Sequence, residues 1–260
     1  MTNQLLQFGD AGFFEVPPSL DTDLAIADSW LVEDGRCRSL QAHFERFSRW
    51  TELQSPGSLS QLPAFFEAVT KTISLDGRWF PRIELHREQP IGNQLHLRLR
   101  ESPEQLGNAI LWTFGEPDPR SQVEIKGPDL SIGMQLRRRA NIMGADEAVI
   151  VDSAGYICEG ALSALVWWRG DVLCAPNAET AWLDSITRRE VFAIAEQMGL
   201  TTRTEKVKPA DLVETEVWIL SSLQGIRPVV DWLDLGGPLA TPTHIDAFNK
   251  RLRLLSSSIR

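Results

Sequence analysis

Lys126 is the first residue whose type and setting could do chemistry. It follows the alternating stretch 123–125 and precedes Gly127-Pro128, so we expect it at the end of a strand beside a chain-breaking pair. Burial disfavours an ammonium ion, so a lysine turned into a cleft would have a lowered pKa and a nucleophilic amine. The alternative is a solvated lysine near a turn, and this residue alone does not decide between the two.

Glu159 is the second candidate. It ends an expected strand over residues 156–159 and precedes the small residues Gly160-Ala161. A carboxylate entering such a turn could face a cationic heterocycle and stabilise its charge. The alternative is a surface glutamate satisfied by water.

Several residues could bind an anion such as a phosphate. Residues 183–188 open an expected helix, and the free N–H groups and dipole of a helix N-terminus attract anions. Ordinary N-capping by Asp184 or Ser185 is the alternative. Ser221-Ser222 ends an expected strand, and its hydroxyls could hold the same anion or simply form a turn. Arg46 shares a helix face with His43 at i, i+3 and could reach a phosphate as a charged fork, unless that face is solvated.

The composition argues against several classes of protein. The 260 residues carry a formal net charge of −9, whereas nucleic-acid binders normally present a basic face. Arginines far outnumber the five lysines, and arginine recognises carboxylates and phosphates, so anionic small molecules are plausible ligands. Three cysteines without a CxxC pair predict no disulfide framework or zinc site and favour a reducing cytoplasm.

Other familiar signals are missing from the sequence. The histidines lack metal-binding spacing, so we expect no metal site, and there is no GxSxG, GxGxxG or P-loop motif. The first ten residues lack the basic flank and apolar core of a signal peptide. No apolar run approaches the roughly 18 residues of a membrane span.

Regular elements must position these candidates. Residues 1–118 are predicted to be β-rich with two helices, and the breaker 115–119 precedes a second region over residues 119–260. In the first region we expect a hairpin formed by residues 28–32 and a turn at 33–35. Helices are expected over 40–53 and 63–73, and half-buried strands over 82–86 and 95–100. In the second region we expect helices over 130–143, 186–198 and 244–255, and strands over 147–151, 156–159, 165–168, 172–175 and 217–221. Two α+β lobes with a cleft between them are the expected fold.

The order and spacing of these residues together resemble the class IV, or fold-type IV, pyridoxal-phosphate (PLP) enzymes. This family includes branched-chain aminotransferase, D-amino-acid aminotransferase and aminodeoxychorismate lyase. The motifs that carry the resemblance are Lys126, 144–148, 152–155, Glu159-Gly160, 169–171 with Pro176, 186–188 and Gly199, with weaker likeness at 34–35, 43–47 and 221–229. The resemblance implies a two-lobe fold like that of D-amino-acid aminotransferase, with a small N-terminal α/β lobe and a larger PLP-binding C-terminal lobe.

The resemblance also implies roles for single residues. Lys126 matches the lysine that forms a Schiff base with PLP and moves protons during catalysis. Glu159 matches the glutamate that pairs with the pyridinium nitrogen and keeps it protonated. The phosphate contacts are matched by Arg46, Ser185, Ile186, Thr187 and Ser222, while 221–223 matches a turn near the substrate carboxylate.

Some positions depart from the family pattern. Gly127-Pro128-Asp129 stands where many relatives have a threonine and an asparagine, and Ala164 replaces a common asparagine. Ser131 occupies a position where aminotransferases often place a tyrosine beside the ring oxygen of the cofactor. The single tyrosine, Tyr156, cannot supply that group from the matched position. These changes argue against a standard branched-chain aminotransferase, and the lyase branch also tends to lack the tyrosine.

Three functions are therefore considered. The first is a PLP-dependent aminotransferase acting on the amino group of a small carboxylate substrate, with amino and keto acids as partners. The second is 4-amino-4-deoxychorismate lyase, which releases p-aminobenzoate and pyruvate. The third is a catalytically silent PLP-fold binding protein. The family is commonly homodimeric, and the arginines that could bind the substrate carboxylate are not ranked by the sequence: Arg82, Arg98, Arg100, Arg137 and Arg227.

Overall fold

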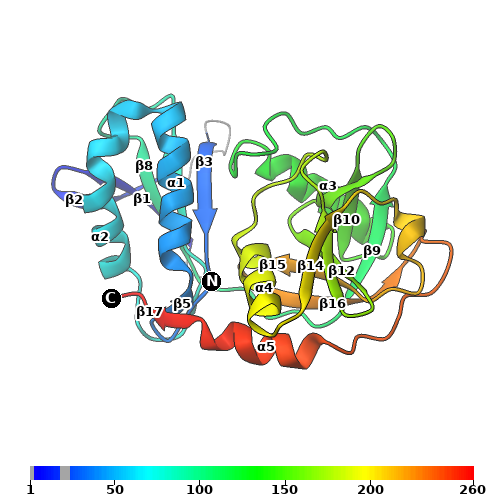
Figure 1. Ribbon diagram of the computed structural model, residues 1–260. Coiled ribbons are helices and arrows are strands. Elements are labelled where there is room, and N and C mark those ends of the chain that lie inside the picture. Colours follow the sequence, from blue (N-terminus) through cyan, green and yellow to red (C-terminus); the bar gives the residue numbers. More distant parts are fainter. Residues whose placement is uncertain (1–2, 18–23) are drawn as a thin grey trace. The chain divides into compact units, whose positions relative to one another are not determined.

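The computed structural model describes residues 3–17 and 24–260, which form two compact units (Figure 1). Unit 1 comprises Met1–Glu104, Ile125–Pro128 and Leu255–Arg260, and unit 2 comprises Gln105–Glu124 and Asp129–Leu254. This division differs from the expected boundary at residue 118. The reason is that β9 (Ala109–Phe114) pairs in parallel with two strands of unit 2.

Unit 1 is built on a five-stranded antiparallel sheet. Its strands lie in the order β2 (Gly12–Val16), β1 (Asn3–Gly9), β8 (Leu95–Arg100), β7 (Arg82–His86) and β3 (Leu24–Ser29). Two helices and a 3-10 turn accompany it: α1 (Leu40–Gln54), η2 (Pro56–Gln61) and α2 (Leu62–Thr72). The core joins helix residues such as Phe47 and Phe65 to Ile83 and Leu97 of the sheet, because alternate strand residues point to one face.

The opposite face of β7 and β8 is buried, contrary to the prediction from the sequence. The alternating pattern predicted half-buried strands, yet all five residues of β7 are buried, including Arg82, Glu84 and His86. The polar residues can be buried because each is ion-paired, with Arg82 and His86 both in contact with the Glu84 carboxylate, and pairing is the usual condition for burying charge. Alternation therefore identified the strands correctly and misjudged the environment of their polar face.

A small second sheet of unit 1 contains the predicted hairpin. Its strands are β17 (Ser256–Ser258), β5 (Arg36–Arg38), β4 (Val32–Glu33) and β6 (Arg78–Trp79). The turn between β4 and β5 places Asp34 and Gly35 at φ of 47° and 69°. Positive φ at both central residues is what a two-residue hairpin requires, so the Asp-Gly prediction is confirmed.

Unit 2 contains an eight-stranded mixed sheet. The strand order is β11 (Ile157–Gly160), β10 (Glu147–Val151), β9, β16 (Gly225–Trp232), β15 (Val217–Ser221), β12 (Ala164–Arg169), β13 (Val172–Pro176) and β14 (Thr201–Glu205). Strand β9 runs parallel to β10 and β16, and β13 runs parallel to β14, while the other neighbours are antiparallel.

Helices and apolar clusters cover this sheet. The helical segments are α3 (Leu130–Ile142), α4 (Ile186–Gln197), η3 (Pro209–Leu212) and α5 (Ile245–Leu254). Trp167 and Trp168 are neighbours on β12 and enter different clusters, as expected for successive strand residues; Trp168 packs with α4 and α5. Leu136 of α3 packs in a third cluster with residues of β9 and β10. Within the described residues, no helix has both the length and the apolar character needed to cross a membrane.

Candidate active site

The backbone at Lys126 is fixed to the edge strand of unit 1. The Ala27 N–H of β3 donates to the Lys126 carbonyl oxygen over 2.6 Å. A Cβ on Gly127 would lie 2.8 Å from the Ile26 Cα and 2.9 Å from the Ala25 oxygen, and the φ of Gly127 is +152°. Only glycine fits this close approach, so Gly127 holds the lysine main chain against β3. The Lys126 side chain is half-buried.

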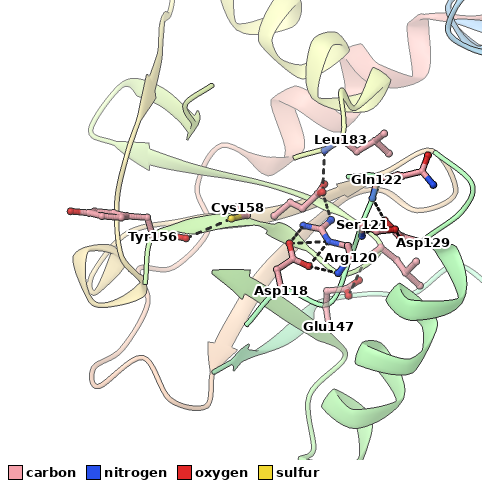
Figure 2. Close-up of polar contacts among 11 residues, drawn as sticks. Asp118, Arg120, Ser121, Gln122, Asp129, Glu147, Tyr156, Cys158 and Leu183 are labelled. Carbon is pink, nitrogen blue, oxygen red and sulfur yellow. Dashed lines mark hydrogen bonds and ion pairs between the residues drawn. The ribbon is translucent and has the colours of Figure 1, made fainter. Parts of the chain in front are cut away.

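The strand predicted before Lys126 is wrong. Residues 121–129 form turns and bends rather than a strand. The Asp129 carboxylate accepts hydrogen bonds from the main-chain N–H groups of Ser121, at 2.9 Å, and Gln122, at 2.7 Å (Figure 2). A side chain that bonds to backbone donors in this way competes with strand pairing and closes the segment into a loop.

Arg46 of α1 lies in a buried cluster with Asp28 and His43. Its Nε and Nη2 atoms donate to the two carboxylate oxygens of Asp28, each over 2.8 Å, and His43 Nδ1 lies 2.7 Å from Asp28 Oδ1. Burial alone would raise the pKa of the Asp28 carboxyl, but Arg46 and His43 hold it far below its usual range. The shared face predicted for His43 and Arg46 is confirmed, and it is buried rather than solvated.

Strand β3 connects these two parts of unit 1. Ala27, which bonds to Lys126, and Asp28, which bonds to Arg46, are consecutive residues. The same piece of strand therefore fixes the main chain at the candidate nucleophile and the guanidinium of the candidate phosphate ligand.

Glu159 ends up buried in unit 2 and held by two donors. Arg120 Nη1 donates to Glu159 Oε1 over 2.5 Å, and the Leu183 N–H donates to the same oxygen over 3.0 Å. Within the described residues, no hydrogen bond ends on Oε2. Burial raises the pKa of the Glu159 carboxyl to about 7, although the nearby Arg120 opposes that shift.

Arg120 is in turn held by Asp118. Its Nε and Nη2 atoms lie 3.0 and 2.8 Å from oxygens of the Asp118 carboxylate, which also accepts the Arg120 main-chain N–H (Figure 2). The sequence predicts a break in the chain at residues 115–119 and gives no role to Arg120. The signal available was an aspartate and an arginine two residues apart, just ahead of the candidate lysine.

The helix whose N-terminus was predicted to bind an anion is α4. Ser185 is the N-cap, and its hydroxyl accepts the Arg188 N–H over 3.3 Å, while Ile186 and Thr187 begin the helix and are buried. Capping by Ser185 is thus confirmed, and the helix terminus keeps the dipole that attracts anions. The Leu183 bond to Glu159 ties β11 to the segment that opens α4, so the structure brings these candidates together.

Ser221 is the last residue of β15, and Ser222 begins the turn that leads to β16. The Ser221 hydroxyl accepts the Gln224 N–H over 3.1 Å, and Gly225 closes the turn at a φ of 66°. Both serines are half-buried. The predicted strand end and turn are therefore confirmed, with the Ser221 hydroxyl stabilising the turn.

A second charged cluster in unit 1 contains two of the candidate arginines, Arg82 and Arg98. Glu84 is fully buried and accepts from Arg82 Nε at 2.7 Å and Arg98 Nε at 2.6 Å, with His86 Nε2 at 2.8 Å. Two guanidinium groups against one carboxylate leave a surplus of positive charge on this face. Arg227, by contrast, is bonded to the Gly107 and Asn108 carbonyl oxygens of the main chain.

The positions that depart from the family pattern lie as follows. Ser131 is exposed in the first turn of α3. The ring of Tyr156 lies beneath the ammonium groups of Lys206 and Lys208, at 4.7 and 5.2 Å. The single tyrosine therefore packs against lysines of unit 2.

Comparisons with known proteins agree on one family. A family model described as "Amino-transferase class IV" matches residues 25–232. A probable branched-chain-amino-acid aminotransferase of Rickettsia bellii is 33% identical over 97 residues, which is 37% of this chain and 33% of that protein. Aminodeoxychorismate lyase of Bacillus subtilis is 26% identical over 111 residues, covering 42% of this chain and 38% of that protein. The matches thus span about a third of the length of these relatives.

Solved structures share the fold over nearly the whole chain. A hypothetical aminotransferase from Mycobacterium tuberculosis in a PLP-bound form has a TM-score of 0.81 at 18% identity, covering 98% of both chains. A fold IV-transaminase from Curtobacterium pusillum has a TM-score of 0.73 at 19% identity, covering 97% of both chains. The fold expected from the sequence, that of fold-type IV enzymes, is confirmed.

Proposed function

Because the chain belongs to the class IV aminotransferase family, we propose that it is a PLP-dependent enzyme that acts on the amino group of a small carboxylate substrate. One observation carries the proposal. The buried Glu159 carboxylate is bonded to the Leu183 main chain, two residues before the N-cap of α4. An acceptor for a ring nitrogen and a helix terminus for a phosphate are therefore held in one unit.

The residues present fit the cofactor. PLP needs an amine for its aldehyde, an acceptor for its ring nitrogen and donors for its phosphate, and when bound it supplies a ring that withdraws electrons from the substrate. Lys126 offers the amine. Glu159 offers its Oε2 atom, which accepts no hydrogen bond from any described residue. The N-terminus of α4 offers main-chain N–H groups.

Each residue then has a defined task. Lys126 would hold the cofactor covalently and carry a proton to and from the substrate carbon. Glu159 would accept the ring N–H and favour its protonated state. Ser185, Ile186 and Thr187 would bind the phosphate through the helix start, with Arg46, Ser221 and Ser222 as further ligands. Gly127 keeps the lysine main chain in place.

Two reactions compete for this site. Transamination between amino and keto acids is the broader activity, and the match to a probable branched-chain aminotransferase supports it. Cleavage of 4-amino-4-deoxychorismate to p-aminobenzoate and pyruvate is the alternative. The exposed Ser131, where a tyrosine is common in aminotransferases, and the match to the Bacillus subtilis lyase favour it.

Product analysis separates these reactions. The purified protein, loaded with PLP, is mixed with pools of amino and keto acids and, separately, with aminodeoxychorismate. New amino acids indicate the aminotransferase, and p-aminobenzoate with pyruvate indicates the lyase. Lys126→Ala should abolish either activity, whereas Lys206→Ala, which alters a lysine beside Tyr156, should not. A loaded protein inactive in both assays would favour a silent binding protein.

We also propose that the protein is a cytoplasmic homodimer. The three cysteines are buried, and within the described residues none of them forms a disulfide, which suits a reducing compartment. The dimer is proposed because members of the family are commonly homodimeric. Light scattering of the purified protein should give twice the 29.2 kDa mass of one chain, and a monomer mass would contradict it.

A further inference from the structure

We propose that Arg120 is a positioning residue that, with the Leu183 N–H, fixes one oxygen of Glu159 so that the other faces the ring nitrogen of the cofactor. This inference rests on the proposed function. It concerns Asp118, which lies in the predicted break at residues 115–119, and Arg120, which follows that break. Its structural basis lies wholly within unit 2.

The first argument is the direction of the hydrogen bonds. Both donors to the Glu159 carboxylate, Arg120 Nη1 and the Leu183 N–H, end on Oε1. The carboxylate is therefore held at one oxygen from a side chain and from the main chain together. Within the described part of the chain Oε2 has no donor, so it is the oxygen left to accept a hydrogen bond from a ligand.

The second argument is the rigidity of Arg120. The Asp118 carboxylate binds its Nε and Nη2 atoms and also its main-chain N–H, while Nη1 is committed to Glu159. The arginine side chain is 7% exposed. A buried, planar guanidinium that is hydrogen-bonded along two edges has little freedom to rotate. Its bond to Glu159 therefore restricts the orientation of that carboxylate.

The third argument is charge. Two carboxylates and one guanidinium leave one net negative charge in the cluster. Arg120 alone would cancel the charge of Glu159 and oppose a cationic ring, and Asp118 restores the balance. Burial already raises the pKa of Glu159 to about 7, and losing the guanidinium would raise it further, leaving a protonated carboxyl that is a poor acceptor.

The test compares the affinity of the apoprotein for PLP with its affinity for the 1-carba analogue, in which C–H replaces the ring nitrogen. The ratio of the two dissociation constants reports the contact at that nitrogen and is independent of turnover. We expect the wild-type protein to prefer PLP. Glu159→Gln sets the value of the ratio when that contact is lost.

Arg120→Gln should lower this preference by roughly tenfold, as expected for loss of a charge-assisted contact. Asp118→Asn should lower it as well, because one negative charge is removed with little change of shape. Arg139→Gln is the matched control, since Arg139 forms an exposed ion pair with Glu116 in the same unit and should leave the ratio unchanged.

A merely structural role would weaken binding of both ligands equally and keep the ratio at the wild-type value. That result with Arg120→Gln, or a ratio that rises because a repelling cation has gone, would overturn the inference. If Arg120→Gln does not fold, Arg120→Lys and Asp118→Asn provide the same reading. Failure of the wild-type protein to bind PLP at all would instead refute the proposed function.

Discussion

Glu147 should make the stability of the protein depend on pH. It begins β10 and is buried, with the Leu162 N–H donating to its Oε1 over 3.3 Å. Burial raises the pKa of the Glu147 carboxyl to about 7, although Arg137 opposes the shift. The folded state thus binds a proton that the unfolded state releases above its ordinary pKa of about 4.3.

The sign and size follow from this difference. A carboxyl with a raised pKa in the folded state supports stability fully below the unfolded pKa, and that support is lost as the pH rises through about 7. Each pKa unit corresponds to about 1.4 kcal/mol, so the loss amounts to roughly 3 kcal/mol by pH 8. Glu147→Gln keeps the acceptor and the shape but cannot ionise, so it should remove this loss.

Urea unfolding of both proteins between about pH 5 and pH 8 measures the effect. The gain in unfolding free energy from Glu147→Gln should grow from about 1 kcal/mol to about 3 kcal/mol across that range. Glu159, whose carboxyl also has a raised pKa, is present in both proteins and cancels in the difference. Glu179→Gln is the control, because that side chain is 70% exposed. A gain from Glu147→Gln that is independent of pH would refute the reasoning.

Three other outcomes are expected. Asp28→Asn should lower the unfolding free energy by about 3 kcal/mol in urea titrations, because Arg46 would stay buried without a counter-charge; a change below about 0.5 kcal/mol, the size of a surface substitution, would contradict this. The protection factors of amides in β3 and β7, measured relative to the intrinsic exchange rate, should fall below about pH 4, since the pKa values of the Asp28 and Glu84 carboxyls are depressed and their contribution is lost on acidification; protection factors that stay constant would count against it. Gly127→Ala should reduce the yield of cofactor-linked protein, because its Cβ would meet the Ile26 backbone at 2.8 Å; full labelling would show that the loop shifts without consequence.

Elements with a clear period were predictable from the sequence. The bounds predicted for β7, β8, β10 and β15 agree with the structure, although nearly every residue of these strands is buried rather than every second one. Helix α1 was equally visible through its apolar face. Strand β9 was not predicted, because its environment comes from β10 and β16, which lie far along the chain.

The candidate site shows the same division. Ser185 as an N-cap and the buried face of His43 and Arg46 follow from local spacing. The hydrogen bond from Arg120 to Glu159 does not follow from local spacing, because the two residues lie 39 positions apart. The role of Arg120 also depends on which carboxylate oxygen it contacts, and no sequence pattern indicates that. Alternation predicted a strand just before Lys126 that does not form. The Asp129 carboxylate accepts hydrogen bonds from backbone N–H groups that a strand would have paired with a neighbouring strand.

The central claim is that the Lys126 amine holds the cofactor. The protein is incubated with PLP, reduced with borohydride, digested and examined by mass spectrometry. The account predicts one phosphopyridoxyl group, on the peptide that contains Lys126. Label on Lys71, Lys206, Lys208 or Lys250 instead, or no label after saturation with PLP, would contradict it.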